Sequence, residues 1–223
     1  MSDVLINQFG VDYHVLDDHE RSENLEHHLN IAMGQDEVWV FAFGSLMWNP
    51  GFDFHKRNHA VLENYVRQFT IWTMIARGTP EHPGLGLCLE PNSGKDCKGF
   101  AYQLKHQSLR SDFDVLWERE MTSGVYQPIW LKLQLLNNST GQVIKHVKAL
   151  TFVVNQNHPH YAGVMPIDKM AIIMAKAKGK YGLNVDYLSN MIEEMASIGD
   201  ANDVFDELLS KIHHINSEYQ HTH

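Results

Sequence analysis

The chain has little cysteine and no long apolar run. Two cysteines, Cys88 and Cys97, occur among 223 residues, which excludes a disulfide framework and a four-cysteine zinc site. Their spacing does not match the Cys-x-x-Cys of a thioredoxin-like pair. No apolar stretch approaches the roughly 18 residues of a membrane-spanning helix, and the start M-S-D-V-L-I-N has no signal-peptide regions. These absences predict a cytoplasmic protein with no membrane partner.

Positive charge is also scarce. Lysine and arginine number 18 and aspartate and glutamate 27, so the formal net charge is −9 with neutral histidines. An excess of acid does not suit a phosphate backbone, which argues against a nucleic-acid partner. The 15 histidines include the pairs His158/His160 and His213/His214, but no zinc signature with a carboxylate is recognisable. We expect most of them on the surface and no bound metal; a histidine-based metal protein is the alternative.

Composition and length favour a single α+β domain. Hydrophobic residues make up 43% and charged residues 20% of the chain, as in soluble proteins with a core. We expect a polar N-terminal extension at residues 1–37, a main domain at 38–214 and a polar tail at 215–223. Apolar spacing predicts a peripheral helix within the extension, carried by Leu25, His28, Leu29 and Met33.

Alternating and helical patterns predict the elements of the main domain. The segment 38–44 alternates as a buried strand that ends at Gly44. Further strands are expected at 66–72, 85–89, 99–104, 129–135 and 143–154, the last two as a hairpin around Gly141. Helices are expected at 108–121, 166–178, and from about residues 184 and 200. The pattern indicates a mixed or antiparallel sheet with a helical C-terminal third.

Several common catalytic motifs are missing. Gly78 and Gly84 are not followed by G-K-[ST], so there is no phosphate-binding Walker loop. Neither a G-x-S-x-G elbow nor an H-E-x-x-H pair occurs. The sequence therefore shows no recognisable serine nucleophile and no metalloprotease site.

The loop F-G-S-L-M-W-N-P at residues 43–50 is a candidate binding loop. Gly44 permits a close approach of the backbone to a ligand, and Ser45 adds a hydroxyl. Backbone N–H groups at such a point could hold a carboxylate or a polarised carbonyl. A simple tight turn is the alternative.

The helix expected at 108–121 places one glutamate on its apolar face. At roughly 100° per residue, Glu120 continues the stripe of Leu109, Phe113 and Leu116, whereas Glu118 points nearly opposite. A carboxyl on an apolar face is desolvated, so its pKa rises toward the range useful for proton transfer. Glu120 is therefore a candidate acid/base group, and Glu118 is expected in solvent.

Two arginines bear on this prediction. The alternative for Glu120 is a fraying helix end at which its carboxylate pairs with Arg119 or Arg77. Arg77 opens the loop R-G-T-P-E-H-P-G at 77–84, where it could clamp a substrate carboxylate. Pairing of Arg77 with a structural acid is the alternative to that role.

Taken together, five segments resemble the ChaC-like family of γ-glutamylcyclotransferases, in its bacterial branch. They are V-F-A-F-G-S-L-M-W-N-P-G-F (40–52), R-G-T-P-E-H-P-G (77–84), C-K-G-F-A-Y (97–102), R-E-M-T-S-G-V-Y-Q-P (119–128) and K-Y-G-L-N-V-D-Y-L (180–188). They occur in the family's order between Val38 and Ile212. The resemblance implies a small β-barrel with surrounding helices, and a catalytic domain at 38–214.

The resemblance also implies an activity. The family cleaves glutathione to 5-oxoproline and Cys-Gly without metal or cofactor, so glutathione is the implied small-molecule partner. The family's catalytic glutamate falls on Glu120. The α-amine of the γ-glutamyl group attacks its own side-chain amide, so no enzyme nucleophile is required, in agreement with the missing motifs.

The family's G-Y-G-S-L loop is A-F-G-S-L in this sequence. The implied substrate-binding residues are therefore Ala42, Phe43, Gly44, Ser45, Leu46 and Met47, with Arg77 and Tyr126 as further candidates. Phe43 lacks the hydroxyl of the family's usual tyrosine, which bears on affinity more than on reaction type. Tyr126 and Tyr161 are equally credible as half-buried aromatics. Cyclotransfer of other γ-glutamyl amines or amino acids, or non-catalytic γ-glutamyl binding, are the alternatives.

Overall fold

A computed structural model describes residues 15–221. The described chain divides into two compact units, one of residues 15–67 and 89–155 and the other of residues 68–88 and 156–221. We call them the barrel unit and the helical unit. The parts of the predicted extension and tail at residues 1–14 and 222–223 lie outside the described range.

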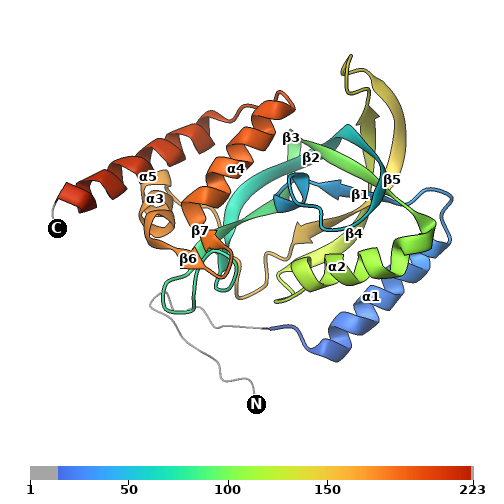
Figure 1. Ribbon diagram of the computed structural model, residues 1–223, viewed down its shortest axis with the longest axis horizontal. Coiled ribbons are helices and arrows are strands. Elements are labelled where there is room, and N and C mark those ends of the chain that lie inside the picture. The colour runs from blue at the N-terminus through green and yellow to red at the C-terminus, as the bar shows by residue number, and fades with distance from the viewer. Residues whose placement is uncertain (1–14, 222–223) are drawn as a thin grey trace. The chain divides into compact units, whose positions relative to one another are not determined.

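The barrel unit holds a closed barrel of five strands in the order β1-β3-β2-β4-β5 (Figure 1). Its elements are α1 (Asp18–Met33), β1 (Trp39–Ala42), the 3-10 turn η1 (Ser45–Met47), β2 (Phe54–Thr73), β3 (Gly84–Leu104), the 3-10 turn η2 (His106–Ser108), α2 (Leu109–Glu120), β4 (Tyr126–Leu136) and β5 (Val143–Val154). The strands β2 and β3 continue into the helical unit. The predicted α+β fold with a small mixed barrel is confirmed.

The register of β1 closes the barrel. It pairs antiparallel with β3, where Phe41 lies opposite Ala101, and parallel with β5, where Trp39 lies opposite Ala149. All four β1 residues are buried, which accounts for its nearly continuous apolar sequence. The strands β4 and β5 form the predicted antiparallel hairpin, and Gly141 takes a φ of 69° in its turn. The short buried strand β1 leads directly into the loop at residues 43–50.

Two strands are longer than predicted. The pattern suggested separate strands at 85–89 and 99–104, but β3 runs unbroken from Gly84 to Leu104, and β2 begins at Phe54 rather than near residue 66. Residues 91–96 are exposed, so this part of the ribbon carries no alternating apolar signal. Asn64 has a φ of 62°, and its side chain accepts a hydrogen bond from the Gly94 backbone at 3.1 Å. The prediction therefore missed the parts of β2 and β3 in which exposed polar residues are paired through their backbone alone.

The helix α1 confirms the peripheral helix predicted in the extension. Asp17 caps its start, accepting from the His19 backbone at 2.8 Å. Leu25, His28 and Leu29 are buried as the spacing suggested, but Met33 is 57% exposed. Ala32 is buried instead, because Met33 lies beyond the packed face of the helix. In Figure 1, α1 lies beside α2.

The helical unit contains α3 (Ile167–Lys176), β6 (Lys178–Gly179), β7 (Gly182–Leu183), α4 (Asn184–Ser197) and α5 (Asp203–His221). The helix α3 packs against α4 and α5. It ends at Lys176 rather than 178, because Lys178 and Gly179 pair with β7. On α5, Phe205, Leu208 and Ile212 are buried, whereas Val204 at the helix start is 56% exposed.

Among the histidines whose side chains the structure describes, most lie at the surface, but two do not. His28 on α1 is 8% exposed, as its place in the apolar spacing of that helix suggested, and His160 in the helical unit is 4% exposed. His28 sits on the buried face of its helix, where its ring meets Trp117. Among residues 15–221, no group of three or more histidine, cysteine, aspartate or glutamate side chains is placed to hold a metal ion. No helix in that range is long and apolar enough to cross a membrane.

Asn184 joins two segments of the helical unit and gives the first testable prediction. It is fully buried, accepts from the Leu85 backbone at 2.7 Å and donates to the Leu85 carbonyl at 2.9 Å. Asn184→Ala leaves both backbone groups unpaired, so we expect the free energy of unfolding to fall by about 2–4 kcal/mol. Urea denaturation measures it. Ser197→Ala, at an exposed site on the same helix, is the control and should change it by less than about 0.5 kcal/mol; equal losses would contradict the account.

Candidate active site

The loop after β1 is a tight turn inside the barrel unit. The buried strand ends at Ala42, Phe43 follows it and is also buried, and η1 spans Ser45–Met47. The Met47 backbone donates to the Gly44 carbonyl at 2.8 Å, and the Asn49 backbone donates to the Ser45 carbonyl at 3.0 Å. Ser45 is half-buried, whereas Leu46 and Met47 are buried. The turn therefore has a defined conformation that leaves Ser45 partly open.

Tyr102 on β3 holds this turn through hydrogen bonds to its backbone. Its side chain is fully buried, and its hydroxyl lies 3.1 Å from the Leu46 carbonyl and 3.0 Å from the Met47 carbonyl. The ring also packs against Phe52, which follows the loop, at a centroid distance of 5.5 Å. A buried tyrosine hydroxyl generally requires a partner, and here the partner is the backbone of the candidate binding loop.

Arg119 ties the same loop to the end of α2. Its guanidinium donates to the Pro50 carbonyl at 2.8 Å, to the Asn49 carbonyl at 2.5 Å and to the Ser45 hydroxyl at 3.4 Å. Gly51 makes this approach possible, because a Cβ there would lie 2.8 Å from the Arg119 Nη1 atom and the residue has a φ of 73°. Arg119 thus brings the predicted loop and the predicted glutamate into one local structure.

The start of α2 is tied to the same segment. Asp112 is buried and accepts from the Ser108 hydroxyl at 2.6 Å and from the Asp53 backbone at 3.4 Å. Burial raises the pKa of Asp112, and the hydrogen bond from Ser108 opposes that rise. Both ends of α2 are therefore bonded to the chain between Ser45 and Asp53.

Glu120 is the last residue of α2 and is half-buried. Protein atoms around its carboxyl displace water and raise its pKa to about 7, and the nearby charge of Arg119 opposes the rise. Its position at the helix C-terminus acts in the same direction as desolvation, because the helix dipole disfavours a negative charge there. Among the described residues, no hydrogen bond to this carboxyl is present. Glu118 is exposed, as the helical count predicted.

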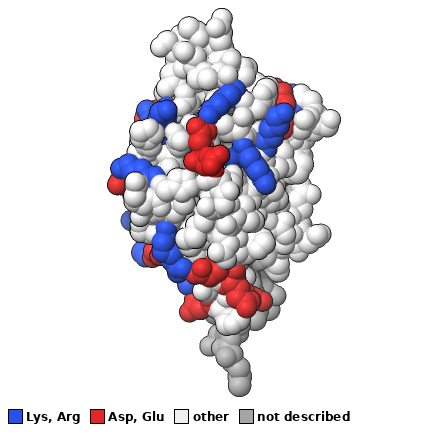
Figure 2. All heavy atoms as spheres, turned by 90° about the vertical axis from the view of Figure 1, so that its right-hand side faces the viewer, with Lys and Arg blue, Asp and Glu red and all other residues white. Residues whose placement is uncertain are grey.

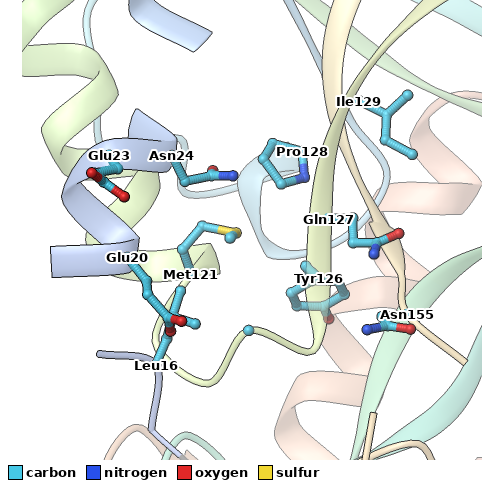
Figure 3. Close-up of a pocket in the computed structure, with 11 residues that line it drawn as sticks. Leu16, Glu20, Glu23, Asn24, Met121, Tyr126, Gln127, Pro128, Ile129 and Asn155 are labelled. Atoms are coloured by element: carbon cyan, nitrogen blue, oxygen red, sulfur yellow. The ribbon is translucent and has the colours of Figure 1, made fainter. Parts of the chain in front are cut away.

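A surface pocket of about 670 Å³ lies next to this helix end (Figure 3). It is lined by Glu20, Glu23 and Asn24 of α1 on one side and by Tyr126 and Pro128 of β4 on the other. Met121, the residue after Glu120, also lines it. Glu120 and the loop at 42–47 are not among its lining residues. Tyr126 is half-buried and opens into this pocket.

Arg77 belongs to the helical unit. Its guanidinium donates to the Tyr181 carbonyl at 2.7 Å and to the Leu183 carbonyl at 3.2 Å, and it lies 5.5 Å from the centre of the Tyr187 ring. These contacts join the segments 77–84 and 180–188. The sequence suggested that Arg77 pairs with a carboxylate, either of a substrate or of a structural acid. In the structure its guanidinium donates to backbone carbonyls instead.

Charges on the face drawn in Figure 2 are mixed in sign. Acidic side chains form small groups, and basic side chains lie around and between them. Pairs in the barrel unit such as Lys145 with Glu37, at 2.6 Å, show the same arrangement locally. This face presents no extended field of one sign that would attract a polyanion.

Sequence reasoning proposed Glu120 and the loop as site residues but did not predict the contacts that join their segments. Tyr102 had a signal, since it ends the segment C-K-G-F-A-Y, but the pattern only suggested a strand. Arg119 appeared as a possible ion-pair partner of Glu120, whereas its hydrogen bonds go to loop oxygens. These pairings span 55 to 74 residues of chain, which is beyond the reach of a local sequence pattern.

Comparison with known proteins supports this assignment of the fold and the family. A family model described as ChaC-like protein matches residues 38–218. The chain belongs to the ChaC-like family. A glutathione-specific gamma-glutamylcyclotransferase of Escherichia coli K12 is 32% identical over 193 residues, which cover 86% of this chain and 80% of that protein.

Other ChaC-like relatives extend the comparison. Gamma-glutamylcyclotransferase 2-1 of Arabidopsis thaliana is 29% identical over 180 residues, covering 78% of this chain and 82% of that protein. A crystal structure of a glutathione-specific γ-glutamyl cyclotransferase from yeast matches with a TM-score of 0.71 at 18% identity, covering 85% of this chain and 99% of that one. At that identity the structural match supports the fold alone.

Tyr102 gives a prediction for this ChaC-like protein. Tyr102→Phe keeps the ring but removes the hydroxyl that holds the Leu46 and Met47 carbonyls. We expect the free energy of unfolding, from urea denaturation, to fall by about 1 kcal/mol. The backbone amides of residues 44–47 should also exchange hydrogen faster. Tyr181→Phe, at a residue 63% exposed, is the control; unchanged exchange in Tyr102→Phe would contradict the role of the hydroxyl.

Glu120 gives a prediction about stability and pH. Its folded-state pKa of about 7 exceeds the ordinary value of 4.5, so between these values the folded protein binds more protons than the unfolded chain. Stability should therefore fall as pH rises from 4.5 to 7. Glu120→Gln removes this penalty and should stabilise the protein at pH 8 by about 1–3 kcal/mol, with no gain at pH 4.5.

Urea denaturation at the two pH values measures this difference. Glu118→Gln, on the exposed side of the same helix, is the matched control and should show no such pH-dependent gain. A Glu120→Gln variant that is no more stable than the parent protein at pH 8 would mean that the carboxyl is not desolvated.

Proposed function

We propose that this protein degrades glutathione by cyclising its γ-glutamyl group, which releases 5-oxoproline and Cys-Gly. Membership of the ChaC-like family and the names of its relatives in Escherichia coli and Arabidopsis support the reaction class. The observation that carries the proposal for this chain is Glu120, a carboxyl with a pKa of about 7 that follows Arg119, the residue bonded to Ser45 of the candidate binding loop. No metal or cofactor has a role in the proposed reaction.

Glu120 serves as both base and acid in this proposal. The carboxylate takes a proton from the α-ammonium of the γ-glutamyl group, and the free amine attacks the side-chain amide carbon. The ring C–N bond forms, and the C–N bond to cysteine then breaks. The ring nitrogen gives up a second proton and Glu120 returns the first, and the cysteine nitrogen takes up both, so Cys-Gly leaves as its ammonium and the ring nitrogen keeps one hydrogen. A pKa near the working pH suits both transfers.

The loop at 42–47 holds the γ-glutamyl group folded for attack. The Ser45 hydroxyl accepts a hydrogen bond from Arg119, so its own hydrogen can point to a substrate oxygen. Tyr102 and Arg119 keep the loop in place, and a well-oriented intramolecular attack can lower the barrier by roughly 7–11 kcal/mol. Phe43 is 8% exposed and apolar, so it contributes shape rather than a hydrogen bond.

Turnover of glutathione by the purified full chain tests this proposal. We expect equal amounts of 5-oxoproline and Cys-Gly, and a fall in kcat of about 10²–10⁴-fold in Glu120→Gln, because a positioned acid/base group contributes that much. Glu118→Gln is the control and should keep the kcat of the parent protein. Product analysis by mass spectrometry measures both Cys-Gly and 5-oxoproline.

Three results would contradict the proposal in different ways. A fully active Glu120→Gln variant would remove Glu120 from the chemistry. Faster release of 5-oxoproline from γ-glutamyl-alanine than from glutathione would assign a different γ-glutamyl substrate. Tight binding of glutathione by calorimetry without any product would indicate a binding module.

A further inference from the structure

The turn that follows Glu120 is held by the segment that precedes α1. The Leu16 backbone donates to the Thr122 carbonyl at 2.8 Å. The Leu16 side chain covers Gly124, where a Cβ would lie 3.1 Å from the Leu16 Cδ1 atom and where φ is 75°. Leu16 therefore fixes the chain two to four residues after Glu120.

A second contact holds the helical turn before Glu120. Asn24 on α1 accepts a hydrogen bond at 3.0 Å from the indole N–H of Trp117. Trp117 is 1% exposed, stacks on Phe113 at 5.4 Å and meets the edge of Phe152 at 5.6 Å. Its carbonyl accepts from the Met121 backbone at 3.0 Å. The orientation of Trp117 is therefore coupled to the last turn of α2.

We propose that Leu16 and Asn24 are positioning residues for Glu120. They bond to the chain on both sides of it, at Thr122 and Trp117, so its carboxyl stays in the water-poor place that suits proton transfer. Figure 3 shows Leu16, Asn24 and Met121 on the same side of the pocket, opposite Tyr126. The matched family model begins at residue 38, after α1, so this support comes from outside the matched part of the chain. The effect on turnover rests on the proposed function; the positioning itself does not.

The positioning acts through packing rather than through charge. Arg119 on α2 is the charged side chain that acts on the Glu120 carboxyl, and it favours ionisation. On α1, Glu20 and Glu23 are exposed, and burial lowers the pKa of His28 to about 4, so His28 is neutral. Loss of a contact from Leu16 or Asn24 should therefore change hydration, not the local charge.

The test is a titration of the Glu120 carboxyl by carbon-13 NMR, together with kcat and KM on glutathione. In Asn24→Ala we expect the pKa to fall from about 7 toward 4.5, because water reaches the loosened helix end. We also expect kcat to fall about tenfold with KM nearly unchanged, as for a misplaced catalytic group. Leu16→Ala is the second variant and should lower both values in the same direction.

Two control variants separate positioning from general loosening of α1. Asn24→Asp keeps an oxygen that accepts from Trp117, so neither its Glu120 pKa nor its kcat should fall appreciably. Glu26→Gln breaks the ion pair between Glu26 and Arg110, which joins α1 to the opposite end of α2, and should leave the pKa and kcat unchanged.

Each outcome decides the proposal. Parent-like pKa and kcat in both Asn24→Ala and Leu16→Ala would overturn it, as would an equal change in Glu26→Gln. If one of these two variants fails to fold, the other carries the test. If the parent protein does not turn over glutathione, the proposed function fails, while the carboxyl titration still confirms or overturns the positioning.

Discussion

Arg119 makes the contact on which the candidate site depends. One guanidinium reaches three oxygens of the loop that follows β1, while the next residue in the chain is Glu120. Because Glu120 follows Arg119 in the chain, these hydrogen bonds join the loop to the end of α2 that carries the carboxyl. Gly51 permits this approach, since any side chain there would meet the guanidinium. The candidate binding loop and the proposed acid/base group are thus joined through a residue that need not touch substrate.

The contacts around the end of α2 place the Glu120 carboxyl where its ionisation lowers the stability of the fold. Glu120 ends a helix, where the dipole disfavours a negative charge, and its surroundings exclude water. A residue chosen for stability alone would be apolar or exposed at this position. Supports on both sides compensate: Tyr102 beneath the loop, Asp112 at the start of α2, and the contacts from Leu16 and Asn24. A side chain that lowers stability, with stabilising contacts around it, is typical of functional sites.

Much of this architecture could be predicted from local patterns. The helical count placed Glu120 on the apolar face and Glu118 in solvent, and the alternation in β1 led to the loop at 43–50, because both depend on neighbours within one or two turns. The polar parts of β2 and β3 could not be found, since their side chains are exposed and only backbone pairing defines them. The roles of Tyr102, Arg119 and Asn24 depend on partners 55 to 93 residues away in the chain, and no local pattern reports such distances.

The chemistry attributed to this site is an attack by the substrate on itself, without water. Turnover of glutathione in oxygen-18 water distinguishes this route from hydrolysis, because hydrolysis adds a solvent oxygen to the γ-carboxyl. The account predicts 5-oxoproline that carries no oxygen-18, as measured by mass spectrometry. Release of glutamate labelled in its γ-carboxyl would contradict it.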